Sequence, residues 1–203
     1  MTVLTPAPTS LRSLNAPASA PAPTAPAALP LAPREVARSL ADRPDLWRPL
    51  VHYRDPRFHT RLATGPDWEA WLLTWLPGQS TGLHDHGGSA GAFAVLVGSV
   101  DESLPLRSPA ALRSAPALRS APALRSPAGA AERAEPVRLI SRRYRAGQVR
   151  AFGTEHLHDV GARSGRRAVT LHVYAPRLTT MTRYELADGR LMVTGREQEG
   201  EDW

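Results

Sequence analysis

The sequence predicts a mostly β domain, a small sandwich or barrel, that begins with short helices. Short apolar or alternating segments recur along the chain, and turn residues such as Gly, Pro or Asp-Gly follow them, a pattern typical of many short strands. Helical patterns occur at residues 33–51, ahead of these segments. The chain has 203 residues, of which 42% are hydrophobic, so it can form one globular domain with disordered extensions.

Two short helices and a series of strands are expected within this domain. Residues 33–41 and 44–51 both open with proline, which is favoured at the first helical position because the N–H there has no partner within the helix. The last two expected strands flank Asp188-Gly189, a hairpin signal. The expected strands are residues 68–76, 92–97, 137–145, 148–152, 168–174, 181–186 and 190–193.

Three segments are expected to lie outside the packed part of the domain, which spans residues 33–195. Residues 1–32 are rich in Pro, Ala, Ser and Thr, and we expect a disordered arm. Residues 105–131 repeat Leu-Arg-Ser with a six-residue period and a proline in each unit, so we expect an inserted low-complexity loop. Residues 196–203 are expected to form a flexible C-terminal tail.

The excess of basic residues is concentrated in the repeat. The net charge is +6, which in general can indicate a nucleic-acid partner. Without the four arginines of the repeat the excess is about +2, and the other basic residues are scattered. We therefore expect no nucleic-acid partner; a basic docking role for the repeat is the alternative. The four arginines are Arg107, Arg113, Arg119 and Arg125.

The absence of cysteine excludes disulfides, thiolate metal ligands and a cysteine nucleophile. No apolar run approaches the length of a membrane span. The N-terminal residues lack the basic start and apolar core of a signal peptide. The lack of a membrane span and of a signal peptide predicts a cytoplasmic protein without a membrane partner; the absence of cysteine does not decide the compartment.

The most informative motif is His84-Asp85-His86, which lies in a segment of strand and loop character. In a strand, alternate side chains share a face, so the two imidazoles are expected to point the same way and Asp85 away from them. Imidazole is the commonest metal ligand near neutral pH. The pair could thus hold a metal ion, or the two histidines could simply be solvated in a loop.

Two glycine-to-histidine spacings favour the metal site. Gly78 stands six residues before the first histidine of the pair, and Gly98 twelve residues after the second. Gly147 and His158 are separated by eleven positions. Both spacings resemble the two motifs of the cupin superfamily. The resemblance implies a double-stranded β-helix, a small jelly-roll barrel, in which the two motifs face each other and share one metal ion.

By this resemblance the metal ligands are His84, His86 and His158. His156 competes for the third place because it would share a strand face with His158. The glutamate ligand of typical cupins is replaced by Gly91 here, and their frequent asparagine by Ala162.

Three neutral imidazoles leave the charge of a divalent ion uncompensated, so such a site favours anionic groups and has open positions. A thiol at that ion would bind as thiolate, and dioxygen suits ferrous iron.

A narrower resemblance, to the cysteine dioxygenase family, covers about residues 34–195 without the repeat. The matching segments are residues 84–86, 93–98, 152–160 and 170–176. In the last segment Thr170, His172 and Tyr174 would lie on one strand face. The resemblance implies a hydrogen-bonded relay that puts the Tyr174 hydroxyl over the bound thiolate and dioxygen; a buried histidine and a core aromatic are the alternative.

The resemblance also implies an arginine for the substrate carboxylate, because a guanidinium binds a carboxylate at two points. Arg61 matches the arginine upstream of the family's first motif, and Arg54 and Arg57 are nearby alternatives. The cysteine that is cross-linked to the tyrosine in animal members corresponds to Gly91, so this cross-link cannot form here.

The resemblance predicts an iron(II)-dependent thiol dioxygenase with Fe(2+) as its cofactor, which oxidises cysteine or 3-mercaptopropionate to a sulfinate with O2. The alternatives are another metal-dependent cupin enzyme, such as an isomerase or hydrolase, and a non-catalytic cupin that binds a small ligand. The expected partners are a small thiol and O2, and the expected state is a monomer or a small homo-oligomer.

Overall fold

The computed structural model describes residues 32–106 and 136–198. The described chain begins with helices α1 (Pro33–Ala41) and α2 (Pro44–Trp47) and the 3-10 turn η1 (Arg48–Leu50). All later elements are strands: β1 (His59–Thr64), β2 (Glu69–Trp75), β3 (Leu83–His84), β4 (Ala90–Val97), β5 (Ser99–Leu106), β6 (Arg138–Arg145), β7 (Val149–Phe152), β8 (Asp159–Gly161), β9 (Ala168–Ala175), β10 (Thr180–Ala187) and β11 (Arg190–Gln198).

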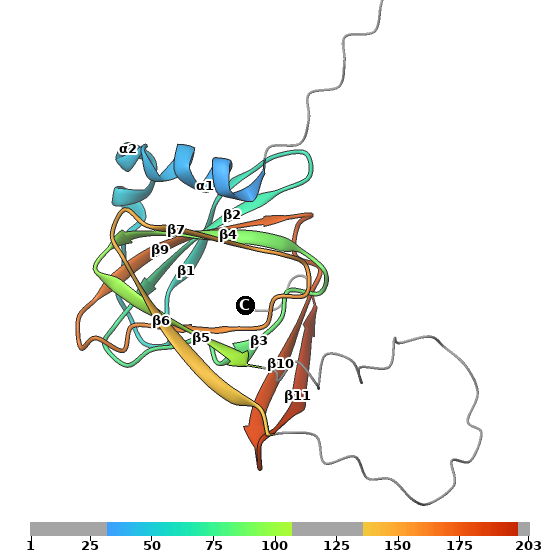
Figure 1. The fold of residues 1–203 in the computed structure, drawn as a ribbon. Helices are drawn as coiled ribbons and strands as arrows, with labels where there is room; N and C mark the ends of the chain where they lie inside the picture. Colours follow the sequence, from blue (N-terminus) through green and yellow to red (C-terminus); the bar gives the residue numbers. More distant parts are fainter. Residues whose placement is uncertain (1–31, 107–135, 199–203) are drawn as a thin grey trace, which may run out of the picture.

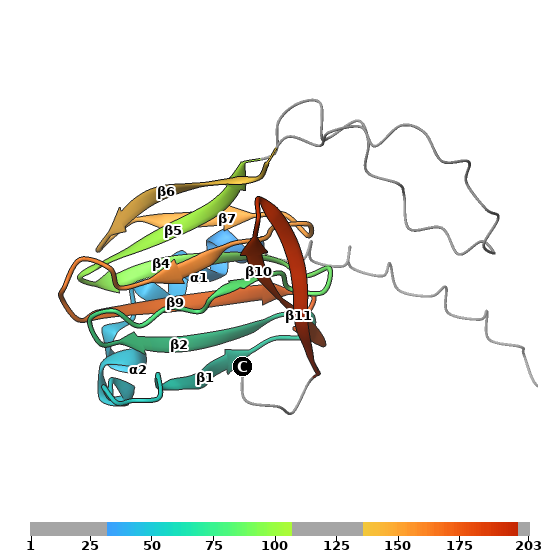
Figure 2. The same cartoon turned by 90° about the horizontal axis from the view of Figure 1, so that it is seen from below.

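The strands form a small barrel from one larger and two smaller sheets. The larger sheet has the order β1-β2-β9-β4-β7, and the smaller ones have the orders β11-β10-β3 and β6-β5-β8. Figures 1 and 2 show the larger sheet facing β5, β6 and β3, with the β10–β11 hairpin at one end of the barrel. The fold is a cupin double-stranded β-helix with two short N-terminal helices, as the sequence predicts.

Strand β9 shows how the sequence assigns residues to the two faces of the large sheet. Its outward residues Leu171 and Val173 pack against Val36 and Ala37 of α1, which covers the outer face of the sheet (Figure 1). Because side chains alternate along a strand, the intervening residues face the barrel interior. Burial on both faces explains why the strand is apolar almost throughout rather than alternating with charged residues.

The expected helices and strands are all found, with small shifts at their ends, and four strands were not anticipated. The four strands that the sequence did not predict are β1, β3, β5 and β8. The sequence of β5, Ser-Val-Asp-Glu-Ser-Leu-Pro-Leu, is rich in polar residues and contains Pro105. Polar residues in β5 are buried between β6 and β8, so tertiary pairing overrides local propensity.

The segments expected outside the packed domain fall largely outside the described residues. This holds for residues 1–31, for residues 107–131 of the expected loop and for residues 199–203. The expected start of the loop at residue 105 was wrong, because Pro105 and Leu106 end β5 and pair there with β6. The start of the expected tail belongs to β11, which continues to Gln198 and pairs there with Thr180. None of the described helices has the length and apolar character that a bilayer crossing requires.

Gly98, which joins β4 to β5, provides a test of the fold. Its φ is +72°, and a Cβ atom there would lie 2.4 Å from the carbonyl oxygen of Arg167. We expect Gly98→Ala to lower the free energy of unfolding by about 1–3 kcal/mol, measured by chemical denaturation. Gly195→Ala is the matched control, because a Cβ atom at that position would meet no described atom within 4 Å. Equal losses in both variants would contradict the prediction.

Candidate metal centre

Backbone pairing brings the two histidine motifs together. His84 of β3 and His158, the residue before β8, are antiparallel partners in an isolated bridge. The amide of His84 donates to the carbonyl of His158 at 2.9 Å, and the reciprocal bond is 3.0 Å long. Directly opposed residues of an antiparallel pair carry their side chains on the same face, so both imidazoles enter the barrel. His86 follows β3 and joins them there.

The three imidazoles are close enough to hold one metal ion. One nitrogen atom from each of His84, His86 and His158 lies within 4.8 Å of the others, and all three side chains are buried. Asp85 points elsewhere: its carboxylate accepts a hydrogen bond from the Tyr184 hydroxyl at 2.6 Å. The structure therefore brings together the three ligands that the motif spacing implies.

Unpartnered nitrogen atoms indicate that these residues fit a metal ion. Among the described residues, neither ring nitrogen of His86 has a hydrogen-bond partner, and neither does Nε2 of His158. Buried polar atoms without partners are rare because each carries a desolvation penalty. His84 donates from Nδ1 to the carbonyl of Gly82 at 2.9 Å, which leaves its Nε2 lone pair for a ligand bond. Lone pairs of this kind are what a divalent ion needs.

Burial keeps the three rings in the form that binds metals. Burial, followed by the proximity of other histidines, lowers the pKa of His84 and His86 well below 6.5. Burial also lowers the pKa of His158. Because the neutral imidazole is the metal ligand, no proton has to leave the site near neutral pH.

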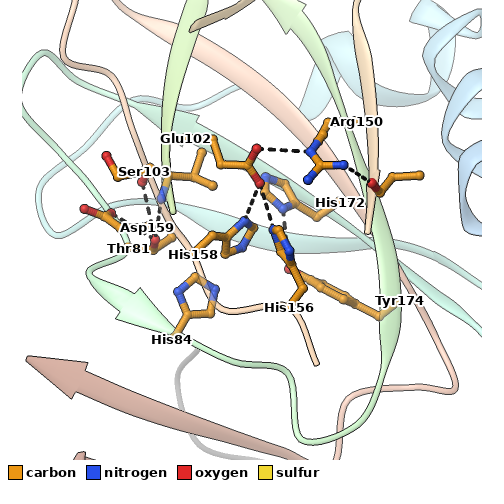
Figure 3. A network of polar contacts seen from close by, with 12 residues as sticks. Thr81, His84, Glu102, Ser103, Arg150, His156, His158, Asp159, His172 and Tyr174 are labelled. Atoms are coloured by element: carbon orange, nitrogen blue, oxygen red, sulfur yellow. Dashed lines mark hydrogen bonds and ion pairs between the residues drawn. The ribbon is translucent and has the colours of Figure 1, made fainter. Parts of the chain in front are cut away.

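A buried carboxylate stands behind the third histidine. Oε1 of Glu102 accepts hydrogen bonds from Nδ1 of His158 and from Nε2 of His156, each at 2.9 Å, and Oε2 accepts one from Nε of Arg150 at 3.2 Å. Figure 3 shows Glu102 between the two histidines and the arginine. Burial alone would raise the pKa of Glu102, but the hydrogen bonds from His156 and His158 outweigh it and lower this pKa well below its usual range.

Glu102 could not be anticipated from the sequence because it lies on β5, the strand with weak β character. The hydrogen bond to Glu102 also shows where His156, the other candidate for the third ligand, points: its Nε2 faces Glu102. His156 groups with Glu102 and His158, and not with the set formed by His84, His86 and His158.

The expected residues of β9 form a hydrogen-bonded chain on the inner face. Nε1 of Trp75 donates to Oγ1 of Thr170 at 2.9 Å. Oγ1 of Thr170 lies 2.9 Å from Nε2 of His172, and Nδ1 of His172 lies 3.4 Å from the Tyr174 hydroxyl. Burial lowers the pKa of His172 to about 3 and raises the pKa of Tyr174. The imidazole is therefore neutral and the phenol protonated at neutral pH.

A narrow cavity opens beside these groups. Its lining includes His84, His172 and Tyr174 together with the guanidinium groups of Arg57 and Arg183. Its free volume is about 30 Å³, room for roughly two or three water molecules. A site of this size and charge suits a small anion.

The two arginines of the cavity differ in how they are satisfied. Arg183 forms a two-point ion pair with Glu197, with N–O distances of 2.8 and 2.7 Å. Arg57 donates from Nη1 to the carbonyl of Ser80 at 3.1 Å, and its buried Nε has no partner within the described ranges. Burial, and then the charge of Arg183, lower the pKa of Arg57. Arg57 is thus a partly buried cation that has no carboxylate partner among the described residues.

Arg61 is not brought to the cavity. It is absent from the described lining residues, its side chain is about half exposed, and its Nε lies 3.5 Å from Oε2 of Glu69. Its guanidinium stacks over the ring of Trp71, 4.9 Å from the ring centroid. Of the sequence candidates for the carboxylate, the structure places Arg57 in the cavity and Arg61 one layer outside it.

Comparison with known proteins gives a family. The model of the family "Cysteine dioxygenase type I" matches residues 35–187, well over half of the chain. Among curated proteins, none matches the sequence.

Solved structures similar to this chain include two cupin-like proteins. One, a conserved protein with a double-stranded β-helix domain from Klebsiella pneumoniae, is 11% identical over 72% of this chain and 91% of its own, with a TM-score of 0.43. The other, a cupin 2 conserved barrel domain protein from Salinispora arenicola, is 16% identical over 64% of this chain and 84% of its own, with a TM-score of 0.38.

His86 is the ligand whose removal tests the centre most directly, since neither of its nitrogens has another role among the described residues. We expect His86→Ala to lower the metal content of the purified protein at least about tenfold, measured as metal per chain by plasma mass spectrometry. His52→Ala, which removes an exposed ring, is the control and should retain the metal. Stoichiometric metal in His86→Ala would rule out this ligand set.

Proposed function

The chain belongs to the cysteine dioxygenase type I family, and from this premise we propose that it is an iron(II)-dependent thiol dioxygenase. It would convert a small thiol carboxylic acid, cysteine or 3-mercaptopropionate, to the sulfinic acid. One thiol and one O2 give one sulfinic acid: sulfur supplies all four electrons that dioxygen takes up, so no other reductant is needed. The observation that carries this proposal is the buried group of three neutral histidines with unpartnered nitrogens beside a small basic cavity.

His84, His86 and His158 would hold the metal. Iron(II) held by three imidazoles supplies redox chemistry and open positions for small ligands. Zinc is also compatible with three histidines, and a zinc-dependent isomerase or hydrolase is therefore the alternative that the test below must separate. The hydrophobic and aromatic residues around the rings, such as Phe93 and Phe152, keep bulk water away.

Arg57 is the residue that we propose for the substrate carboxylate. Its buried Nε has no partner, and the buried indole Nε1 of Trp71, which also lines the cavity, has none either among residues 32–106 and 136–198. Two unpartnered N–H donors from residues that line one cavity suit an anion, because a charged acceptor can satisfy such donors. Arg57 thereby replaces Arg61, which the family resemblance implies, since Arg61 already faces Glu69.

Tyr174 would donate a hydrogen bond to the reacting groups. Since burial keeps its hydroxyl protonated, it can act as a donor in the cavity. Thr170 accepts a bond from Trp75 and can donate its own hydrogen to Nε2 of His172. Nδ1 of His172 then carries a hydrogen for the Tyr174 oxygen, which leaves the phenolic hydrogen free to point to the substrate.

The wider expectations from the sequence also remain proposals. We propose a cytoplasmic location, a small thiol and O2 as the only partners, no nucleic acid, and a monomer or small homo-oligomer. The arginine repeat, on which a nucleic-acid role would depend, lies outside the described residues.

Metal analysis followed by oxygen uptake tests the function. We expect the protein to contain iron, and the iron(II) form to consume about one O2 per thiol oxidised and to release a sulfinate, identified by mass spectrometry. The panel should contain cysteine, 3-mercaptopropionate and cysteamine, of which cysteamine has no carboxylate. Bound zinc without oxygen uptake would favour the isomerase or hydrolase, and ligand binding without turnover a non-catalytic cupin; either result would overturn the proposal.

The two arginine candidates can be separated by substitution. We expect Arg57→Gln to lower kcat/KM for 3-mercaptopropionate about 10–100-fold, as loss of a charged hydrogen bond does, and to change the value for cysteamine little. Arg61→Gln is the matched control and should stay within about threefold of the unsubstituted enzyme for both thiols. A larger loss of kcat/KM for 3-mercaptopropionate in Arg61→Gln than in Arg57→Gln would show that Arg61 binds the substrate carboxylate instead.

A further inference from the structure

We propose that Glu102 is a positioning residue for the metal: it holds His158 in the tautomer whose Nε2 faces the other two imidazoles, and it supplies the negative charge that three histidines lack. This inference rests on the proposed metal site and deepens it. It concerns a residue on β5 that the motif spacing does not reach.

The tautomer follows from the direction of the hydrogen bond. The carboxylate of Glu102 carries no hydrogen: its Oε2 accepts from Nε of Arg150, and its Oε1 accepts from Nε2 of His156. Nδ1 of His158, 2.9 Å from the same Oε1, is therefore a donor. A neutral imidazole carries one hydrogen. With that hydrogen on Nδ1, the unpartnered Nε2 of His158 keeps a lone pair that would be available to a metal ion. His84 reaches the same state through its bond to Gly82, but with an uncharged acceptor.

The sheet makes this arrangement rigid. Glu102 is the register partner of Val160 across β5 and β8, and His158 stands two residues before Val160, on the same face and within diagonal reach. His158 is in turn bridged to His84. Backbone pairing thus places the carboxylate close to His158 and His158 opposite His84, and Glu102 is fully buried.

The charge of Glu102 alters the electrostatics of the centre. Three neutral ligands leave the full charge of a divalent ion uncompensated, and Arg57 and Arg183 add positive charge at the cavity. A carboxylate bonded to a ligand histidine makes that ligand more basic and compensates part of the charge. Removal of such partners typically lowers metal affinity about 10–100-fold.

His156 admits a competing interpretation. Glu102, His156 and His158 could themselves hold an ion, with His158 bridging two metals. That would require Nδ1 of His158 to lose its hydrogen, and all three residues already have hydrogen-bond partners in this network. We therefore interpret the group as hydrogen bonded, and the number of metal ions per chain decides between the two interpretations.

Titration with Co(II), followed by its visible absorption, tests the proposal on the full-length metal-free protein. We expect Glu102→Gln to bind Co(II) about 10–100-fold more weakly than the unsubstituted protein. Asp101→Asn is the matched control, because Asp101 is the preceding residue and is also buried and ion-paired. Its partner is Arg143, whose Nε lies 2.8 Å from Oδ1 of Asp101. Its Co(II) affinity should stay within about threefold.

The tautomer can be measured without any substitution, which keeps the proposal testable if Glu102→Gln does not fold. In metal-free protein with 15N-labelled histidine, long-range nitrogen–proton correlation spectra should show the hydrogen of His158 on Nδ1. His156→Phe should leave that tautomer and one bound Co(II) per chain unchanged, because Glu102 keeps its bond to His158.

Each outcome has a distinct meaning. Failure of the unsubstituted protein to bind Co(II) would refute the three-histidine site itself. Equal Co(II) affinity in the unsubstituted protein and in Glu102→Gln would refute the role of Glu102 but not the three-histidine site. A hydrogen on Nε2 of His158 would have the same meaning. Two Co(II) per chain, falling to one in His156→Phe, would show the bridged metal pair instead.

Discussion

The reciprocal backbone bond between His84 and His158 is the interaction on which the centre depends. The two residues lie far apart in the sequence, and pairing across an antiparallel bridge is what places their side chains next to each other on one face. Two further residues of the metal centre are placed relative to this bridge: His86 follows one partner along the chain, and Glu102 reaches the other from the neighbouring strand. A slip of one residue would turn the imidazoles outward.

Charge in the barrel interior is distributed in two groups. Glu102 and Arg150 lie behind the histidines (Figure 3), whereas Arg57 and Arg183 line the cavity. Buried charges are tolerated when they are paired and hydrogen bonded, and three of these four have such partners. Arg57 has no described carboxylate partner, which makes it the position where an anionic substrate would gain most. The same argument separates it from Arg61, which has Glu69.

Strand β9 links this chemistry to the stability of the fold. Its outward residues Leu171 and Val173 lie in the core between the sheet and α1, and its inward residues Thr170, His172 and Tyr174 form the hydrogen-bonded chain. Because the outer face is covered by a helix, the backbone of β9 is held from both sides. The inner residues are consequently fixed by packing, as a site that must orient a small substrate requires.

The sequence by itself determined a mostly β domain, because period-two alternation and turn residues are local properties of the chain. Its glycine and histidine spacings, also local, carry the family resemblance that implied the barrel and the three histidines. It also placed Thr170, His172 and Tyr174 on one face for the same reason. Only the tertiary structure revealed Glu102, since β5 has weak β character and its carboxylate is defined by partners on other strands. Only the tertiary structure likewise separated Arg57 from Arg61, which are arginines a few residues apart in the sequence. Arg61 has a carboxylate partner, Glu69, whereas Arg57 lines the cavity and has no such partner among the described residues.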